Sequence, residues 1–155
     1  MTAELLGDRW SLIVLRDIMF GGSTHFRELL TNSIEGIASN ILSARLTKLV
    51  DAGLLTRRDD PSHKQKVEYN LTEPAIQLVP IIAMLGDWGA RWLTTEPRLT
   101  IRARLLFDGG PPMWERFMDE LRNQHLHHGP RPSDGVQAEL ARAHTGPTTA
   151  EHVDQ

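Results

Sequence analysis

An apolar segment in the middle of the chain limits the available folds more than any other feature. Within 75–86 the only polar side chain is Gln77. We predict one long helix over 72–95, with Thr72 as its N-cap and Pro74 in the first turn, where proline is tolerated. A helix that is apolar on nearly every side must be buried on more than one side. We therefore expect a second copy of the chain to cover it; the alternative is a cover by the chain's own C-terminal segment.

The large apolar side chains of this helix form a stripe that we predict to be a dimer interface. The stripe consists of Leu78, Ile81, Ile82, Leu85, Trp88 and Trp92. Ile76, Val79 and Ala83 fall largely outside it, which again indicates burial on a second side. Pro80 lies in the helix interior and should kink it, at a cost of about 3 kcal/mol relative to alanine in an exposed helix.

The N-terminal third of the chain predicts several short helices. The first begins near Asp8, a favourable N-cap, and ends at the Gly21-Gly22 pair. Thr24 is suited to cap the second. The second and third helices cover 25–31 and 38–52.

The third of these helices has an outer face of short side chains. At about 100° per residue, five small or hydrogen-bonding residues fall within roughly 140° of arc. They are Ser39, Asn40, Ser43, Ala44 and Thr47. Solvated faces usually carry Glu and Lys, which are better helix formers than Ser, Asn and Thr. The face therefore indicates contact with a partner, an ordinary solvated face being the alternative. Arg45 lies on the inward side, where its guanidinium should reach a carboxylate or a phosphate.

Two short strands joined by a polar connection follow this helix. They are predicted at 54–58 and 66–71, around the proline-containing segment 59–65. The side chains that we assign to phosphate contacts are Arg57, Arg58, His63, Lys64 and Lys66. A basic hairpin beside a helix with a short polar face is the layout of a winged helix-turn-helix. In that fold the helix enters the major groove of DNA and the wing touches phosphates or the minor groove. A solvated hairpin of mixed charge is the alternative.

The composition excludes several kinds of site. The 155 residues include 17 Lys and Arg against 20 Asp and Glu, a formal net charge of −3, which excludes a generally basic nucleic-acid coat. The absence of cysteine excludes disulfides, cysteine zinc sites and thiol nucleophiles. We find no phosphate-cradling glycine loop, nucleophile elbow or HExxH pair, and expect neither an enzyme nor a cofactor. No apolar run approaches the ~20 residues of a membrane span, and we expect a cytoplasmic protein with no membrane partner.

Several distinctive motifs occur in one order along 5–93. They include Leu6-Gly7-Asp8-Arg9-Trp10, His25-Phe26-Arg27-Glu28-Leu29, Gly36-Ile37-Ala38-Ser39-Asn40-Ile41-Leu42, Val67-Glu68-Tyr69-Asn70-Leu71-Thr72 and Asp87-Trp88-Gly89. Together they resemble the HxlR-type transcriptional regulators of the MarR/ArsR-like superfamily. The resemblance implies a homodimer that binds near-palindromic operator DNA and acts as a repressor or an activator.

The sequence departs from the family pattern in three ways. Members usually have a longer N-terminal stretch, often with a cysteine that senses oxidants in some of them. This chain begins later and has no cysteine, so we expect no thiol sensing. Recognition helices of the family often include Lys or Gln where this one has small residues, so the operator does not carry over. Pro74 and Ala75 replace a more usual Lys-Gly pair, which should affect local capping only.

The composition shifts beyond Pro97. We predict short helices at 100–107, 113–124 and 134–143. The expected fold is mainly α with a small β-hairpin wing. It comprises a winged helix-turn-helix with its dimerisation helix (1–95), a helical C-terminal extension (96–128) and a flexible tail (129–155). His125 and His128 are spaced to share a metal, but we favour a solvated helix end whose histidines suit the helix dipole.

The sequence leaves two functions open. The first is a sequence-specific DNA-binding regulator, in which Asn40 is the best candidate for a direct base contact, because an amide can pair with adenine. The second is a winged-helix protein-interaction module that does not bind DNA, which the net charge of −3 favours slightly. A small-molecule effector of the regulator would lie between the DNA-binding lobe and the dimer helices, near Trp10, Trp88 and Trp92.

Overall fold

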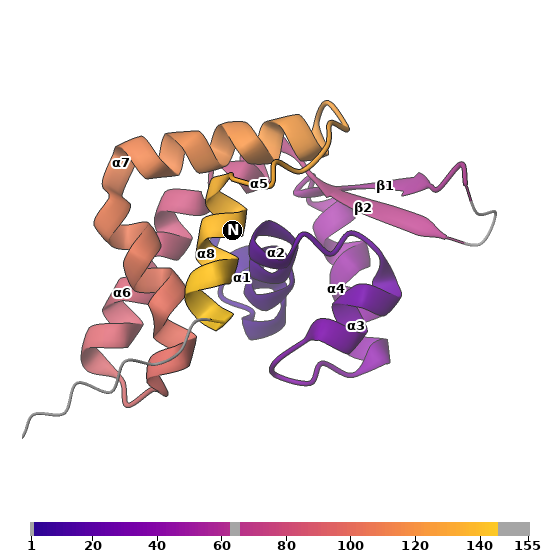
Figure 1. Ribbon diagram of the computed structural model, residues 1–155. Coiled ribbons are helices and arrows are strands. Elements are labelled where there is room, and N and C mark those ends of the chain that lie inside the picture. The colour runs from indigo at the N-terminus through magenta and orange to yellow at the C-terminus, as the bar shows by residue number, and fades with distance from the viewer. Residues whose placement is uncertain (1, 63–65, 146–155) are drawn as a thin grey trace, which may run out of the picture.

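The computed structural model describes residues 2–62 and 66–145 (Figure 1). Within them the elements are α1 (Thr2–Leu6), α2 (Arg9–Gly21), α3 (Phe26–Asn32), α4 (Ser39–Asp51), β1 (Leu55–Asp59), β2 (Val67–Leu71), α5 (Glu73–Ile76), α6 (Val79–Trp92), α7 (Pro97–His125) and α8 (Val136–Thr145). The two strands form an antiparallel hairpin in which Leu55 pairs with Leu71 and Asp59 with Val67. The hairpin projects away from the helices (Figure 1), and the predicted fold class is confirmed.

Helix α2 begins and ends where the sequence predicts. The Asp8 carboxylate accepts the Trp10 backbone N–H at 3.2 Å and the Ser11 hydroxyl at 2.8 Å. Gly22, with φ of 66°, provides the left-handed residue that ends the helix. Helix α1 precedes α2 along the chain and was not predicted as a separate element, because five residues are too few to show an apolar period.

Helix α3 is capped differently from the prediction. Its N-cap is His25 and not Thr24. The Thr24 carbonyl instead accepts the Tyr69 backbone N–H at 2.7 Å, and His25 forms a β-bridge with Glu68. These contacts attach the start of α3 to strand β2, so the helix-turn-helix and the hairpin are joined.

The predicted helix over 72–95 is two helices, α5 and α6, separated at 77–78. Pro80 lies in the first turn of α6, where its missing N–H removes no helical hydrogen bond. The predicted kink at Pro80 is therefore wrong: a new helix starts just before the proline. The Thr72 hydroxyl donates to the Gly53 carbonyl at 2.6 Å and makes no capping hydrogen bond to α5.

Helix α7 covers one side of α6. Gly110, with φ of 62° and ψ of −165°, turns the chain inside α7, so its two halves contain the predicted helices at 100–107 and 113–124. The second half then crosses the top of the molecule (Figure 1). At Gly86 the two helices approach so closely that a Cβ there would lie 2.5 Å from the Cβ of Ala103.

The inner side of α5 and α6 is part of the chain's own core. Ile76, Val79 and Ala83 are buried, as expected for a helix covered on a second side. They belong to one apolar core that also includes Leu15 of α2, Leu46 of α4 and Leu106 of α7. This side of α6 is therefore covered by the chain itself, and the C-terminal segment supplies part of that cover.

Helix α8 lies in the segment that we expected to be a flexible tail. The Glu120 carboxylate accepts the backbone N–H groups of Val136 at 2.7 Å and Gln137 at 3.2 Å. The Gln137 side chain donates to the Met19 carbonyl of α2 at 2.5 Å. The prediction of a flexible tail is wrong for 136–145, because these contacts fix α8 against α7 and α2, whereas the helix predicted at 134–143 is present as α8. Residues 146–155 lie outside the described part of the chain.

His125 contradicts the prediction of a solvated helix end. It is only 4% exposed, and its Nδ1 lies 3.0 Å from the Asn70 side-chain oxygen on strand β2. Burial lowers the pKa of His125 to about 4. The imidazole therefore joins α7 to the hairpin in its neutral form, while His128 is exposed. Among the described residues no helix is long and apolar enough to cross a bilayer.

Candidate nucleic-acid interface

The outer face of α4 is open to solvent, as the sequence pattern predicts. Its five short residues are all exposed: Ser39, Asn40, Ser43, Ala44 and Thr47. The Thr47 hydroxyl donates to the Ser43 carbonyl one turn earlier, at 3.1 Å. Ala44 and Thr47 also border an open groove shared with Leu5 of α1. Nothing in the described part of the chain covers this face, which leaves it free for a partner.

The inner side of α4 is fixed to the start of α2. Leu42, Leu46 and Leu49 are buried in the core. Arg45, whose partner the sequence left open, pairs through Nε with the Asp8 carboxylate, although this buried Nε has no well-aligned hydrogen bond. A protein carboxylate, and not a phosphate, therefore holds this guanidinium.

Asp8 is the common anchor of α2 and α4. Lys48, which the sequence pattern did not single out, places its Nζ 3.4 Å from the same carboxylate. Burial raises the pKa of Asp8, but hydrogen bonds from Ser11 and Trp10 and the charge of Arg45 outweigh it, and the net shift is downward. The carboxylate that caps α2 thus also sets the orientation of α4.

The two arginines of β1 differ in their surroundings. Adjacent residues of a strand point to opposite faces. Arg58 pairs with Glu68 across the hairpin at 2.6 Å. Burial raises the pKa of Glu68, but hydrogen bonds from Arg58 and Asn70 lower it further than burial raises it. Arg57 is exposed and forms no ion pair with any residue the structure describes. Arg57 is therefore the better placed of the two for a phosphate.

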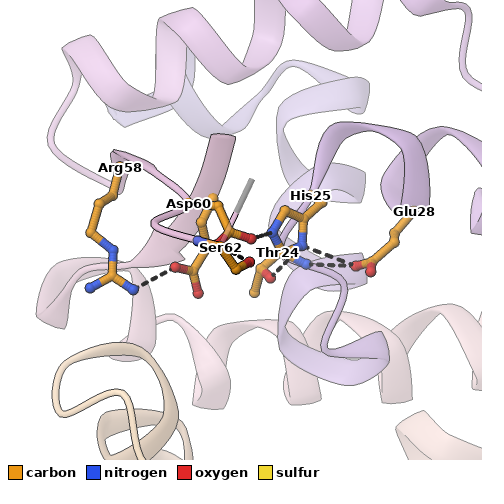
Figure 2. Close-up of polar contacts among 7 residues, drawn as sticks. Thr24, His25, Glu28, Arg58, Asp60 and Ser62 are labelled. Atoms are coloured by element: carbon orange, nitrogen blue, oxygen red, sulfur yellow. Dashed lines mark hydrogen bonds and ion pairs between the residues drawn. The ribbon is translucent and has the colours of Figure 1, made fainter. Parts of the chain in front are cut away.

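The far end of the hairpin is linked to the start of α3 (Figure 2). His25 Nε2 lies 3.3 Å from an Asp60 carboxylate oxygen, and His25 Nδ1 lies 3.7 Å from Glu28. Ser62 donates to Asp60 through its backbone N–H at 2.8 Å and through its hydroxyl at 2.5 Å. These hydrogen bonds lower the pKa of Asp60 to about 2. The wing is thus held at a set distance from the helix-turn-helix.

Of the remaining basic residues assigned to the wing, the structure describes Lys66. Lys66 is exposed, and its carbonyl accepts the Asp60 backbone N–H at 2.8 Å. His63 and Lys64 fall outside the described residues, so their part of the assignment stays a prediction. The structure brings Arg57 and Lys66 onto the same hairpin that flanks α4.

The outer face of α6 is a large exposed apolar surface. Ile81, Leu85, Trp88 and Trp92 of the predicted stripe are exposed, Trp92 at 73%, and Leu78 and Ile82 are half-buried. Met84 and Leu93, which the stripe omitted, are exposed beside them. Met84 lies three positions after Ile81 and four before Trp88, so helical spacing alone could have included it. We call these six exposed residues the α6 outer face.

A cavity of about 640 Å³ lies behind α6, between it and the helices α2, α3 and α7. Of the residues predicted for a dimer interface or effector pocket, Ile82 lines this cavity. Trp10 is half-buried elsewhere, under the guanidinium of Arg9 at 4.7 Å from the ring centre. Trp88 and Trp92 point outward on the α6 outer face.

Comparison with known proteins gives a consistent result. The model of the HxlR-like helix-turn-helix family matches residues 5–97. Uncharacterized HTH-type transcriptional regulators of Mycobacterium bovis and Mycobacterium tuberculosis are 32% identical over 142 residues, which cover 89% of this chain and 87% of theirs. The reduced form of the transcriptional regulator YodB from B. subtilis is 27% identical, with a TM-score of 0.51 over 60% of this chain and 89% of that one.

Proposed function

Because the chain belongs to the HxlR-like helix-turn-helix family of transcriptional regulators, we propose that it binds operator DNA as a homodimer, with one α4 in each of two successive major grooves. The observation that carries this proposal is the open outer face of α4, whose five short side chains are all exposed. Binding to the operator would then repress or activate the controlled gene.

The N-terminal residues of α4 would contact base edges, as recognition helices do. Asn40 lies in the first turn of α4 and is exposed, and its amide can donate and accept in the bidentate contact that identifies adenine. Ser39 and Ser43 would contact bases or phosphates beside it. Short side chains let the helix backbone approach the groove closely, so the whole face would lie near the base edges.

The wing would add sequence-independent affinity. The basic residues assigned to the wing would neutralise phosphates next to the groove that α4 occupies. They are Arg57, His63, Lys64 and Lys66. Arg58 would contribute less, because Glu68 already balances its charge at 2.6 Å. The wing would therefore strengthen binding to all sequences, while α4 would choose among them.

The α6 outer face would form the homodimer interface. Its six apolar side chains are exposed in the single chain, and monomeric proteins rarely expose contiguous apolar patches of this kind. A twofold axis beside α6 would place the two α4 helices on one side of the dimer, separated by roughly 34 Å to match one turn of DNA.

The direct test is a gel shift at low salt with the DNA upstream of the protein's own gene. We expect the wild type to shift this DNA and the Arg57→Ala/Lys66→Ala variant to bind it several-fold more weakly. Arg116→Ala, which removes an exposed charge on α7, is the control and should bind like the wild type. No shift by the wild type would support the alternative, a winged-helix module that binds another protein.

A further inference from the structure

The cavity behind α6 has the dimensions of a small-molecule site. Its volume of about 640 Å³ lies within the range of roughly 300–1,000 Å³ typical of ligand pockets. One wall comes from α2 and α3 and the other from α6 and α7. Most of the lining surface is apolar, and Phe20, Leu29, Ile82 and Leu106 contribute to it. A ligand with a largely apolar body would fit this lining.

The wall formed by α6 is built from very small residues. Ala83, Gly86, Gly89 and Ala90 face the cavity at successive turns of the helix. Gly89 and Ala90 leave a smooth, shallow surface along the helix, while Gly86 lies against Ala103 of α7 and Ile82 also lines this wall. A planar ring can lie flat against such a surface and contact it over its whole area, whereas a branched body would touch it at few points.

One of the two arginines in the cavity is fully occupied. Arg16 forms two hydrogen bonds with Glu35, at 2.7 and 2.8 Å, and two with Asp17, at 3.0 and 2.7 Å. Both carboxylates of the cavity are therefore bound to the same guanidinium, and Arg16 stays as a structural link between α2 and the segment that leads into α4.

The second arginine has no such partner. The Nε of Arg102 on α7 is buried, and in the part of the chain that the structure describes it has no hydrogen-bond partner. Burial and then the nearby charge of Arg16 lower the pKa of Arg102, the charge of Asp17 raises it, and the net shift is downward. A buried guanidinium Nε without a hydrogen-bond partner is unfavourable, and an anion supplied from outside would satisfy it.

We propose that this cavity binds an aromatic carboxylate, with the ring against the small residues of α6 and the carboxylate on the Arg102 guanidinium. A carboxylate accepts two parallel hydrogen bonds from a guanidinium, which is the strongest neutral-pH contact that this lining offers. The apolar walls would bury the ring. Neither the ring nor the carboxylate alone would use both parts of the site.

The same helix carries the cavity wall on one side and the α6 outer face on the other. At about 100° per residue, Gly86 and Ala90 lie roughly opposite Trp88 and Trp92. A ligand would therefore press on the back of the helix that joins two protomers, while also touching α2 of the DNA-binding lobe. This coupling rests on the proposed function, and it requires that the ligand bind the DNA-competent and incompetent spacings with different affinity.

Ligand binding is tested on the free protein, so that it does not depend on DNA. Isothermal titration calorimetry would compare naphthoate, its neutral analogue naphthalenemethanol and the linear carboxylate decanoate. We expect naphthoate to bind about tenfold or more tightly than either of the others, since a charge-assisted contact and a flat ring both contribute. Equal binding of the neutral analogue would overturn the role of Arg102, and tighter binding of decanoate would overturn the planar site. No binding by any of the three would overturn the proposal.

Two variants and a control separate the site from the fold. Arg102→Gln should weaken naphthoate about tenfold or more and leave naphthalenemethanol unchanged. Gly89→Leu should block both, because Gly89 lines the cavity. A Cβ at Gly89 meets only Leu93 Cδ1, at 3.9 Å, so the helix need not move. Arg116→Gln, an exposed arginine on α7 outside the cavity, should bind like the wild type. Unchanged naphthoate affinity in Gly89→Leu would place the ligand elsewhere.

The effect on DNA is measured separately. If naphthoate binds and the wild type also shifts DNA, the ligand should change the DNA affinity of the wild type and not that of Gly89→Leu. Ligand binding by a protein that does not shift DNA would sustain the site and reject the proposed function. DNA binding without any ligand affinity would support the proposed function and reject the ligand site.

Discussion

Helices α4 and α6 each turn one face to solvent, and the two faces differ in chemistry. The α4 face carries short side chains such as Asn40 and Ser43, whereas the α6 outer face carries Trp88 and Trp92. Water satisfies the first face at no cost. Large apolar side chains gain about 25 cal/mol for each Å² that leaves water. On the proposed function, α6 would have a permanent partner and α4 a partner that binds and dissociates.

The largest effect should come from breaking the α6 side of this comparison. Trp88→Glu places a charge in the centre of the α6 outer face, where a second copy of the chain would bury it without an ion-pair partner. We expect a dimer to become a monomer in sedimentation velocity. DNA affinity should fall about 100-fold or more, because a single protomer loses the second, linked half-site contact.

A matched surface charge serves as the control for this variant. Ser133→Glu adds the same charge at an exposed position away from α6 and should remain dimeric with unchanged DNA affinity. A Trp88→Glu protein that still sediments as a dimer would move the interface to another surface.

The contact between His125 of α7 and the hairpin should make the stability of the protein depend on pH, unlike the α4 face. The pKa of His125 is about 4 in the folded protein against 6.5 for the free side chain, so the unfolded state binds a proton more readily. The contribution of neutral His125 to the free energy of unfolding is fully present above pH 6.5. It is lost as the pH falls toward 4, by about 3 kcal/mol at most. Urea titrations of His125→Gln should show a flatter pH dependence across this window.

The neighbouring histidine gives the comparison for this measurement. His127 is exposed, so His127→Gln should keep the pH dependence of the wild type. An equal flattening in both variants would show that burial of His125 is not the cause.

The helix-turn-helix was predictable from sequence because its signals are local. Asp8 and Gly22 mark the ends of α2 by their own backbone preferences, and the spacing of Leu42, Leu46 and Leu49 fixes which side of α4 is buried. The exposed α4 face then follows by elimination. Each of these inferences needs only residues within one helix.

The features that depend on contacts between residues far apart in the sequence were less predictable. A helix that is apolar all round does not reveal which side α7 covers, and the burial of His125 depends on Asn70, far away in the sequence. The pairing of Arg58 with Glu68 depends on strand register, which the polar connection between the strands leaves undefined. Lys48 was missed because its partner, Asp8, lies in another element.

Removing the side-chain amide of Asn40 on α4 should lower DNA affinity less than breaking the dimer does. Asn40→Ala should weaken specific DNA by about 1–3 kcal/mol per half-site and leave nonspecific DNA unchanged, because only a base contact is lost. Fluorescence anisotropy with both DNAs measures the difference. As a control, Gln77→Ala removes an exposed amide on the connection between α5 and α6 and should change neither affinity. If Asn40→Ala weakened the binding of both DNAs equally, Asn40 would be a phosphate contact.

The wing should show the smallest effect, as a change in salt dependence. If each half-site makes about three phosphate contacts, the slope of log K against log salt is near −5 for the dimer. Arg57→Ala should make this slope less steep by about 2, one contact per protomer. Arg58→Ala should change it less, since Glu68 already pairs with that guanidinium. A slope near zero in the wild type would reject phosphate binding altogether.

The most direct test of the proposed roles of the two faces is selection of bound sequences from random DNA by the purified protein. A dimer joined through α6 predicts an inverted repeat whose half-site centres lie about one helical turn, roughly 10 base pairs, apart, with two chains bound per duplex. Enrichment of a single unrepeated half-site, or of no sequence at all, would contradict it.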